Sequence, residues 1–306
     1  MKFGCSLIVR GKHATQENLR TMARQAEAWG FDSLWASDHL IIPPLETSHY
    51  PGSATGQFPD SWLQRYFEPL AVLNYLAGCT QRILLGTSVL ILPMRNPIEV
   101  AKAIAGADVL SQGRILFGVG VGWFKEEFDV LRQPFHERGR RTDEYLQICQ
   151  KLWTEDPVTF AGRYYHFRQA HFHPKPLQKP HPPILIAGQS PAALRRAARF
   201  GNGWHPFALT PEALAPIVPQ FHAAVREAGR QVAELEISLK VRLRFGDGPE
   251  PLAPLHGSPE QVITTIKQYQ ALGVQHLILD FAPETIGNAL ATLERFVREV
   301  RPAFAP

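Results

Sequence analysis

Hydrophobic residues along the chain form short continuous runs, and segments with a helical period separate these runs. The run at 83–92 (ILLGTSVLIL) has too few polar positions for a strand with one exposed face and is typical of parallel strands buried on both faces. Asn96 can cap the helix that follows, and Gly113 can end it. A second hydrophobic run, 115–121, comes next and ends in the glycines of GVGVG, residues 118–122. These segments predict one strand–helix–strand unit.

The same alternation of strand and helix continues through all 306 residues, without a linker. Eight such units predict an α/β fold, a (β/α)8 TIM barrel, in one domain over residues 1–306. Two insertions interrupt the alternation: a loop at 40–65 after the second strand, and a helical region with an aromatic, irregular excursion at 157–179 after the fourth. The predicted strands cover residues 3–9, 32–36, 83–92, 115–121, 183–187, 203–206, 236–245 and 276–281.

Composition narrows the possible partners to small molecules. The chain is 45% hydrophobic and 20% charged, has a net charge of +4, and contains no Lys/Arg run longer than two residues, which argues against nucleic acid. The longest mainly apolar run, 83–94, is too short to cross a bilayer, so we expect no membrane segment. Three widely spaced cysteines suggest reduced core residues and a cytoplasmic location.

Candidate active groups lie where the predicted strands end, because TIM barrels carry their active sites at the carboxyl ends of the strands. Asp38 and His39 follow the second strand, and His39 can exchange a proton near neutral pH. A surface histidine and a turn aspartate are the alternatives. Glycines at 118–122 and the helix start at 188–192 (GQSPA) offer close backbone approach and free N–H groups for a phosphate, although plain helix capping also explains the second.

Several better-known motifs are absent. A Rossmann loop would need glycine at position 123, where the chain has Trp123. His166, His171 and His173 match no standard zinc spacing, so we expect no metal. No GxSxG nucleophile elbow occurs.

Taken together, several stretches resemble the luciferase-like flavin and deazaflavin oxidoreductases. The segment that includes Ser37, Asp38 and His39 is most similar to the branch that uses coenzyme F420 rather than FMN. The matching stretches span most of the chain and include AEAWGFDSLWASDH (26–39), GTSVLILPMRNPIEVAK (86–102), LSQGRILFGVGVGW (110–123), RRTDEYLQICQKLW (140–153) and GQSPAALRRAARFGNGW (188–204).

The resemblance implies an enzyme that moves hydride between F420 and an organic substrate at the carboxyl-terminal mouth of the barrel. It places His39 near the reactive carbon, Asn96 near the cofactor ring, and a non-prolyl cis peptide at Ser88-Val89 behind that ring. It also implies a homodimer. The residues that match the family's phosphate-binding loops are Gly118, Gly120, Val121, Gly122, Gly188, Gln189, Ser190 and Ala192.

One departure from the family bears on the substrate. In the family's sugar-phosphate dehydrogenases an acid follows the fourth-strand glycines, and here the position holds Trp123. An apolar or aromatic substrate is therefore favoured, in a pocket formed by Trp62, Tyr66, Trp123 and Trp204, with the 40–65 loop as a lid. Three alternatives stay open: a reduced-FMN monooxygenase that activates dioxygen, a non-enzymatic flavin-binding relative, and a phosphate-binding barrel enzyme such as an isomerase.

Overall fold

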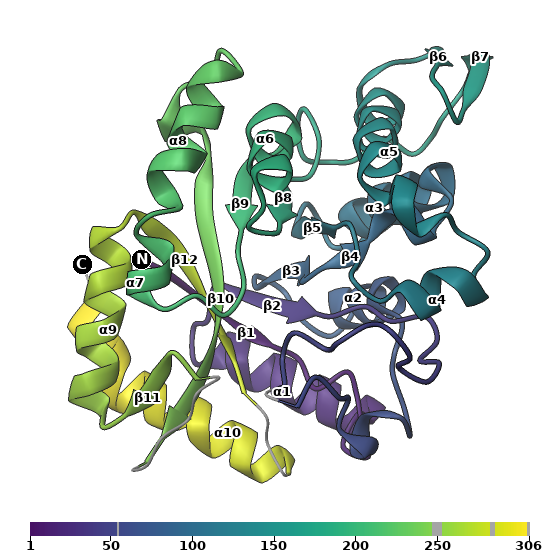
Figure 1. Cartoon of the computed structure of the whole chain (residues 1–306). Coiled ribbons are helices and arrows are strands. Elements are labelled where there is room, and N and C mark those ends of the chain that lie inside the picture. The colour runs from purple at the N-terminus through teal and green to yellow at the C-terminus, as the bar shows by residue number, and fades with distance from the viewer. Residues whose placement is uncertain (54, 247–252, 282–284, 305–306) are drawn as a thin grey trace.

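A closed ring of parallel strands, with helices outside it, forms the body of the molecule (Figure 1). The computed structural model describes residues 1–306 except 54, 247–252, 282–284 and 305–306. The ring closes because β1 pairs with both β2 and β12, while β10 pairs with both β9 and β12. Among the described residues the eight barrel strands are β1 (Lys2–Ser6), β2 (Ser33–Ala36), β3 (Leu84–Thr87), β5 (Ile115–Gly120), β8 (Ile184–Ala187), β9 (Gly203–His205), β10 (Glu236–Phe245) and β12 (Val274–Asp280).

Helices follow the strands, and several of them begin at capping residues. The side chains of Thr15, Asn96, Ser190 and Ser258 each accept a hydrogen bond from a backbone N–H in the first turn. The described helices are α1 (Gln16–Ala28), α2 (Pro69–Ala77), α3 (Pro97–Leu110), α4 (Lys125–Val130), α5 (Arg138–Thr154), α6 (Pro191–Phe200), α7 (Pro211–Leu214), α8 (Val218–Glu227), α9 (Pro259–Ala271) and α10 (Ile286–Arg295). The predicted TIM barrel is confirmed.

Both predicted insertions are present. After β2 the chain runs to α2 as a long loop with a single 3₁₀ turn at Asp60–Trp62. After β5 it forms α4, α5 and a two-stranded hairpin, β6 (Val158–Ala161) with β7 (His166–Ala170), which projects from the barrel at the upper right of Figure 1. A short strand, β11 (Leu255–Gly257), extends the sheet beside β10.

The third hydrophobic run departs from the prediction because it is not one continuous strand. It contains β3, then a cis peptide bond at Ser88-Val89, then β4 (Leu90–Ile91) and a 3₁₀ turn at Leu92–Met94. The cis bond lies where the family resemblance implied one. β4 no longer pairs with β2 but lies against β5, with Leu90 opposite Val119. Residues 87–91, which we call the bulge, therefore turn towards the fourth strand of the barrel.

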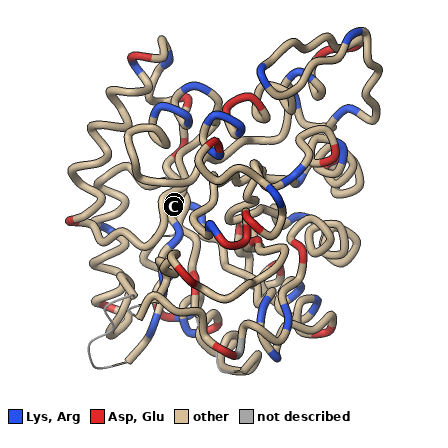
Figure 2. The backbone as a smooth tube through the Cα atoms, turned by 45° about the vertical axis from the view of Figure 1, so that its right-hand side comes forward, with Lys and Arg blue, Asp and Glu red and all other residues tan. Residues whose placement is uncertain are grey.

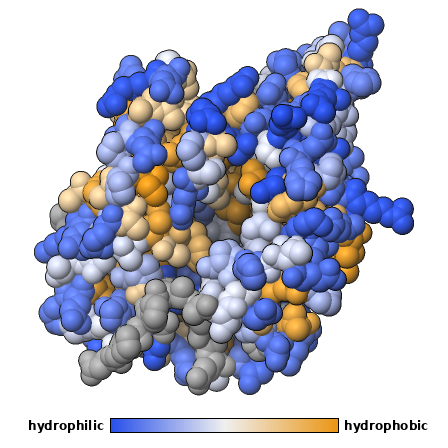
Figure 3. All heavy atoms as spheres, viewed as in Figure 1, coloured by the Kyte–Doolittle hydropathy of each residue, from blue (hydrophilic) through white to orange (hydrophobic). Residues whose placement is uncertain are grey.

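The surface is mixed in charge and mostly hydrophilic. Acidic and basic residues are interspersed along the backbone in Figure 2. On the face drawn in Figure 3, hydrophobic side chains gather around a hollow near the centre of the view. Among the described residues, no helix combines the length and the apolar composition needed to cross a bilayer.

Candidate functional site

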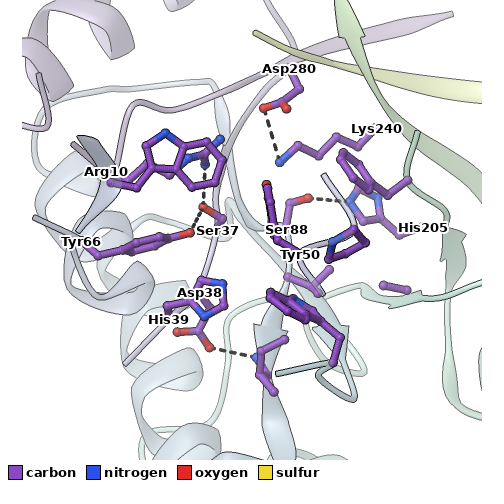
Figure 4. A pocket seen from close by; sticks show the side chains of 17 residues that line it. Arg10, Ser37, Asp38, His39, Tyr50, Tyr66, Ser88, His205, Lys240 and Asp280 are labelled. Carbon is purple, nitrogen blue, oxygen red and sulfur yellow. Dashed lines mark hydrogen bonds and ion pairs between the residues drawn. The ribbon is translucent and has the colours of Figure 1, made fainter. Parts of the chain in front are cut away.

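A cavity opens at the carboxyl ends of the barrel strands, between the bulge, the loop after β2 and the ends of β10 and β12 (Figure 4). Its volume is about 190 Å³, below the roughly 300–1,000 Å³ typical of small-molecule sites. Side chains of the 40–65 loop cover part of it. The lining residues are Arg10, Ser37, Asp38, His39, Tyr50, Pro51, Trp62, Tyr66, Ser88, Val89, Ile91, Trp123, Ala187, His205, Phe207, Lys240 and Asp280.

His39 is held by a buried acid that the sequence did not point to. Its Nδ1 lies 2.7 Å from Oε2 of Glu127, whose side chain is fully buried at the start of α4. The other carboxyl oxygen of Glu127 accepts the backbone N–H groups of Leu40 and Ile41 at 2.7 and 3.2 Å. Because the carboxylate accepts, we assign the hydrogen to Nδ1, which leaves Nε2 of His39 as the nitrogen available to the cavity.

Asp38 has a different arrangement from the catalytic one we expected. One carboxyl oxygen accepts the N–H of Ile91 at 2.9 Å, and the other accepts from Arg95 at 2.6 Å. Burial raises the pKa of Asp38 above its usual value, although the Arg95 guanidinium favours the charged form. One oxygen thus attaches the bulge to the end of β2, and the other attaches Arg95, which lies beyond the bulge. This geometry supports a positioning role for Asp38 in place of proton transfer.

Ser88 of the bulge is fixed by a buried histidine on β9. Its hydroxyl lies 2.8 Å from Nε2 of His205, and Nδ1 of His205 lies 3.1 Å from the Ser238 hydroxyl. The His205 ring also stacks on Trp35, with centroids 5.1 Å apart. Burial, together with the charge of Lys240, lowers the pKa of His205 to about 3, so the ring is neutral at physiological pH.

The opposite wall of the cavity carries charged groups. Lys240 of β10 and Asp280 at the end of β12 are both buried, and Nζ of Lys240 lies 3.6 Å from Oδ1 of Asp280. Arg10, which follows β1, donates to the Ser37 hydroxyl at 3.2 Å, and Ser37 lies 2.6 Å from the hydroxyl of Tyr66. Figure 4 shows Lys240 and Asp280 across the cavity from His39, while Arg10 lies beside Ser37 and Tyr66.

The 40–65 loop contributes aromatic rings to the cover of the cavity. Tyr50 stacks on Phe58 at 4.9 Å and contacts the Trp123 ring at 5.7 Å, and the Phe58 and Tyr66 rings both meet the His39 ring edge-on at 5.3 Å. Of the four residues predicted to form an aromatic pocket, Trp62, Tyr66 and Trp123 line the cavity.

Glu126 attaches the loop to α4. Its Oε1 accepts the backbone N–H groups of Glu46, Thr47 and Ser48 at 3.0, 2.6 and 3.0 Å. Burial opposes the charge of Glu126, but hydrogen bonds from the 47–48 segment outweigh it and lower its pKa.

Trp204, the fourth predicted pocket residue, is a correction. It is fully buried outside the barrel strands, packs on Phe221 of α8 at 5.2 Å and donates from Nε1 to the carbonyl of Gly188 at 2.7 Å. Strand alternation explains this, because neighbouring residues of β9 point to opposite faces: His205 points towards the cavity and Trp204 points away.

The glycines at the end of β5 also differ from the prediction of a phosphate loop. A Cβ on Gly118 would overlap the Thr87 carbonyl oxygen, and one on Gly120 would lie 2.5 Å from a methyl carbon of Val89. Gly122 has φ +84°, and a Cβ there would lie 2.6 Å from the Phe128 ring. Neither these glycines nor Val121 line the cavity. The space that a ligand would need is filled by the bulge and α4.

The second predicted phosphate loop is exposed and accessible. Gly188 has φ +107°, and residues 188–192 are exposed to solvent at the start of α6. The Ser190 hydroxyl caps the helix by accepting from Ala193 at 3.3 Å, while the Gln189 amide donates to the Phe207 carbonyl at 2.8 Å. Ala187, which precedes the loop, lines the cavity. The loop is therefore adjacent to the cavity without forming part of its lining.

Asn96 is a further correction. It is exposed, its side-chain oxygen accepts from Ile98 at 2.9 Å as the cap of α3, and it does not line the cavity. In the hairpin region, His171 and His173 each contact Asp156, at 3.2 and 3.1 Å, and are exposed. No group of three or more His, Cys, Asp or Glu in the part of the chain that the structure describes is placed to hold a metal.

Arg10 and Lys240 line the candidate site and Glu127 holds His39 in it, and sequence reasoning missed all three. A signal existed for Lys240, because a lysine in the middle of a hydrophobic strand is rarely buried without a role. For Glu127 the signal was weaker: two acids in the first turn of a helix are usually explained by the helix dipole.

Comparison with known proteins identifies relatives over most of the chain. The family model described as luciferase-like monooxygenase matches residues 1–254. An F420-dependent glucose-6-phosphate dehydrogenase of Nakamurella multipartita is 33% identical over 236 residues, which cover 74% of this chain and 63% of that protein. An uncharacterised protein of Mycobacterium tuberculosis is 33% identical over 60% of this chain and 64% of its own length. The chain thus spans just under two thirds of these relatives.

Solved structures share the fold over the full chain. A monooxygenase, RslO1 from Streptomyces bottropensis, superposes with a TM-score of 0.81 at 21% identity and covers all of both chains. An F420-dependent secondary alcohol dehydrogenase, solved with an F420–acetone adduct, superposes with a TM-score of 0.81 at 19% identity and covers 100% of this chain and 99% of its own. At these identities the likeness concerns the barrel alone.

Proposed function

Because the chain belongs to the luciferase-like monooxygenase family, we propose that it is an F420-dependent oxidoreductase acting on a small organic molecule at the mouth of its barrel. The observation that carries this proposal is the buried Glu127–His39 pair beside the cis peptide at Ser88-Val89, in one cavity. Relatives that are at least 30% identical and named for F420 dependence support the choice of cofactor.

The residues at the cavity and beside it fit F420, which has a flat ring and a phosphate-bearing tail. The bulge lines the cavity with Ser88 and Val89, and β4 behind it is fixed by Asp38 through the Ile91 N–H. The exposed start of α6 next to Ala187 offers N–H groups and the positive end of a helix dipole to a phosphate. Bound F420 would supply or accept the hydride. The protein contributes binding, orientation and proton control.

His39 is the group we propose for proton control. Glu127 holds its Nδ1, so that Nε2 can accept or donate a proton at the cavity surface. Four aromatic rings, those of Phe58, Tyr66, Trp123 and Phe124, lie 5.3–6.1 Å from the His39 ring and exclude water around it. These rings also favour a flat or apolar substrate.

We propose that the 40–65 loop acts as a lid. The cavity beneath it is smaller than a cofactor and a substrate together require, so the segment that carries Tyr50 and Trp62 must move for both to enter. A homodimer and a cytoplasmic location remain predictions.

A side-by-side titration of the apo-protein with F420 and FMN, each oxidised and reduced and followed by fluorescence, tests the proposal. We expect tight binding of F420 and at least tenfold weaker binding of FMN. Preference for FMN would instead favour a reduced-FMN monooxygenase, for which oxygen consumption is the assay. Binding of neither would contradict any flavin-type function and favour a phosphate-binding barrel enzyme.

A further inference from the structure

The charged wall of the cavity contains more positive than negative groups. Among the described lining residues, Arg10 and Lys240 face a single free carboxylate, Asp280, because Asp38 is already paired with Arg95. Burial raises the pKa of Tyr50 to about 12 and also that of Tyr66, so neither hydroxyl supplies a negative charge.

Arg242 adds a further cation close by. It lies two residues after Lys240 on β10 and so shares its face of the strand. Burial by itself would raise the pKa of Asp280, but Lys240, Arg10 and Arg242 together outweigh it and lower that pKa. One carboxylate is therefore surrounded by three cations.

These groups are only partly satisfied by one another. The 3.6 Å between Lys240 Nζ and Asp280 Oδ1 is too long for a hydrogen bond. Among the residues that the structure describes, neither that oxygen nor Nε of Arg242 has a hydrogen-bond partner. Lys240 is only 7% exposed and Asp280 only 3%. Burying a charged group without full pairing costs folding free energy. The arrangement therefore indicates a role for these charges other than stabilising the fold.

We propose that this wall is the binding subsite for the carboxylate group of an aromatic substrate. The inference rests on the proposed function, because it assigns the wall to the substrate of the same cavity. Arg242 does not line the cavity, so the lining cations Lys240 and Arg10 exceed the unpaired lining carboxylate Asp280 by one charge. A carboxylate would accept hydrogen bonds from Lys240 and Arg10 and would balance that one charge. A phosphate dianion fits less well because Asp280 would repel its second charge.

The rest of the cavity favours a flat body on that carboxylate. The guanidinium of Arg10 lies over the face of the Trp62 ring, 3.9 Å from its centroid, and this contact holds Arg10 in place. Tyr66 and Trp123 continue that surface towards His39. An aromatic acid would place its ring between these side chains and its carboxylate against Lys240, which selects acids over neutral molecules of the same shape.

Apo-protein titrations can test this subsite without any turnover. Trp62 and Trp123 line the cavity, so their fluorescence reports binding directly, and thermal unfolding gives a second readout. The probes are benzoate, the neutral isostere benzamide, and inorganic phosphate. We expect benzoate to bind at least tenfold more tightly than benzamide and to raise Tm, with phosphate weaker than benzoate.

Variants that remove one positive charge test whether Lys240 and Arg10 bind the carboxylate of benzoate. Lys240→Met should weaken benzoate binding at least tenfold and leave benzamide binding within twofold, and Arg10→Met provides a second variant if the first fails to fold. Lys267→Met removes one charge from the exposed face of α9 and should leave both affinities unchanged. Equal affinity of benzoate and benzamide, stronger binding of phosphate, or unchanged benzoate binding in both cavity variants would overturn the subsite.

A parallel F420 titration separates this result from the proposed function. If Lys240→Met lowers F420 affinity as much as benzoate affinity, the wall belongs to the cofactor and the subsite is wrong. If the wild type binds benzoate as expected but no F420, the subsite stands and the proposed cofactor fails.

Discussion

Two strand ends, 118–122 (GVGVG) and 188–192 (GQSPA), were both predicted to bind a phosphate but have different surroundings in the folded protein. At the first, the space next to each glycine is taken by Thr87, Val89 or Phe128. At the second, residues 188–192 are exposed beside the cavity at the start of α6. We call them the packed end and the open end.

Glycine at a strand end shows that something approaches the backbone closely, but not whether it is a ligand or another part of the chain. The packed end contributes to the candidate site through the side chains that follow it: Trp123 lines the cavity and Glu127 contacts His39. The open end presents only backbone N–H groups. Substitutions should therefore affect turnover at the packed end and cofactor affinity at the open end.

The largest effect is expected at the side-chain pair beside the packed end. His39→Ala removes the group proposed to move a proton and should lower kcat by roughly 10²–10⁴-fold, while the Kd for F420 changes by less than about threefold. Glu127→Gln keeps the shape but loses the anionic acceptor for Nδ1, and should lower kcat less. Steady-state kinetics and fluorescence titration measure the two quantities.

His136→Ala, at an exposed histidine on the 3₁₀ turn before α5, is the matched control and should behave as wild type. If His39→Ala kept wild-type kcat, His39 would have no part in the mechanism. If it lost F420 affinity in proportion to kcat, its role would be binding.

Next in size is the effect of filling the packed end. Gly118→Ala places a Cβ against the Thr87 carbonyl, which belongs to the backbone and cannot swing away, so the bulge must shift. We expect the free energy of unfolding to fall by about 3 kcal/mol, measured by urea denaturation. Gly106→Ala on α3 is the control, because no atom lies within 4 Å of the added carbon. It should stabilise by about 0.5–1 kcal/mol, and equal losses in the two variants would contradict the packing argument.

A smaller effect is expected at the open end. Ala192→Asp adds a negative charge in the first turn of α6, which suits the helix dipole but repels a phosphate. F420 affinity should fall by about three- to tenfold, while thermal stability stays the same or rises. Ala291→Asp adds the same charge to an exposed position on α10 and should leave affinity unchanged. Retained affinity in Ala192→Asp would remove the open end from the cofactor site.

The last expected effect appears only on acidification and concerns His205, which fixes the bulge through Ser88. Its pKa is lowered to about 3 in the folded protein from an ordinary value of 6.5. The unfolded chain therefore binds the extra proton between these pH values, and the contribution to stability is lost as pH falls from 6.5 towards 3. His205→Gln should flatten this slope by up to about 1.4 kcal/mol per pH unit, measured by urea denaturation from pH 7 to 4.

His136→Gln, at the same exposed histidine, should leave the pH slope unchanged, since an exposed side chain meets solvent in both states. A slope equal to that of the wild type in His205→Gln would show that His205 is not the group responsible.

Strand and helix positions were predictable because hydrophobic runs and capping residues are local signals. Asn96 caps its helix as expected, and Thr15, Ser190 and Ser258 cap theirs in the same way. The break in the third strand was implied only by family resemblance, because no local property of Ser88 or Val89 distinguishes a bulge from a continuous strand.

Residues of the candidate site were predictable where they follow a strand closely, as His39 and Trp123 do. They were not predictable where segments distant in the sequence meet. Glu127 lies 88 positions from His39, and Arg10, Lys240 and Asp280 come from three separate strands or the loops that follow them. Trp204 and Asn96 were misplaced for a related reason. The orientation of a side chain depends on register and on competing hydrogen-bond partners, and residue type does not encode either.

Glu127 also links motion to chemistry. One of its oxygens holds His39 and the other holds the first two backbone N–H groups of the lid, Leu40 and Ile41. If the proposed lid opened at its start, the same carboxylate would lose two of its donors and keep its contact with His39. One acid thus connects the start of the proposed lid with the residue proposed for proton transfer.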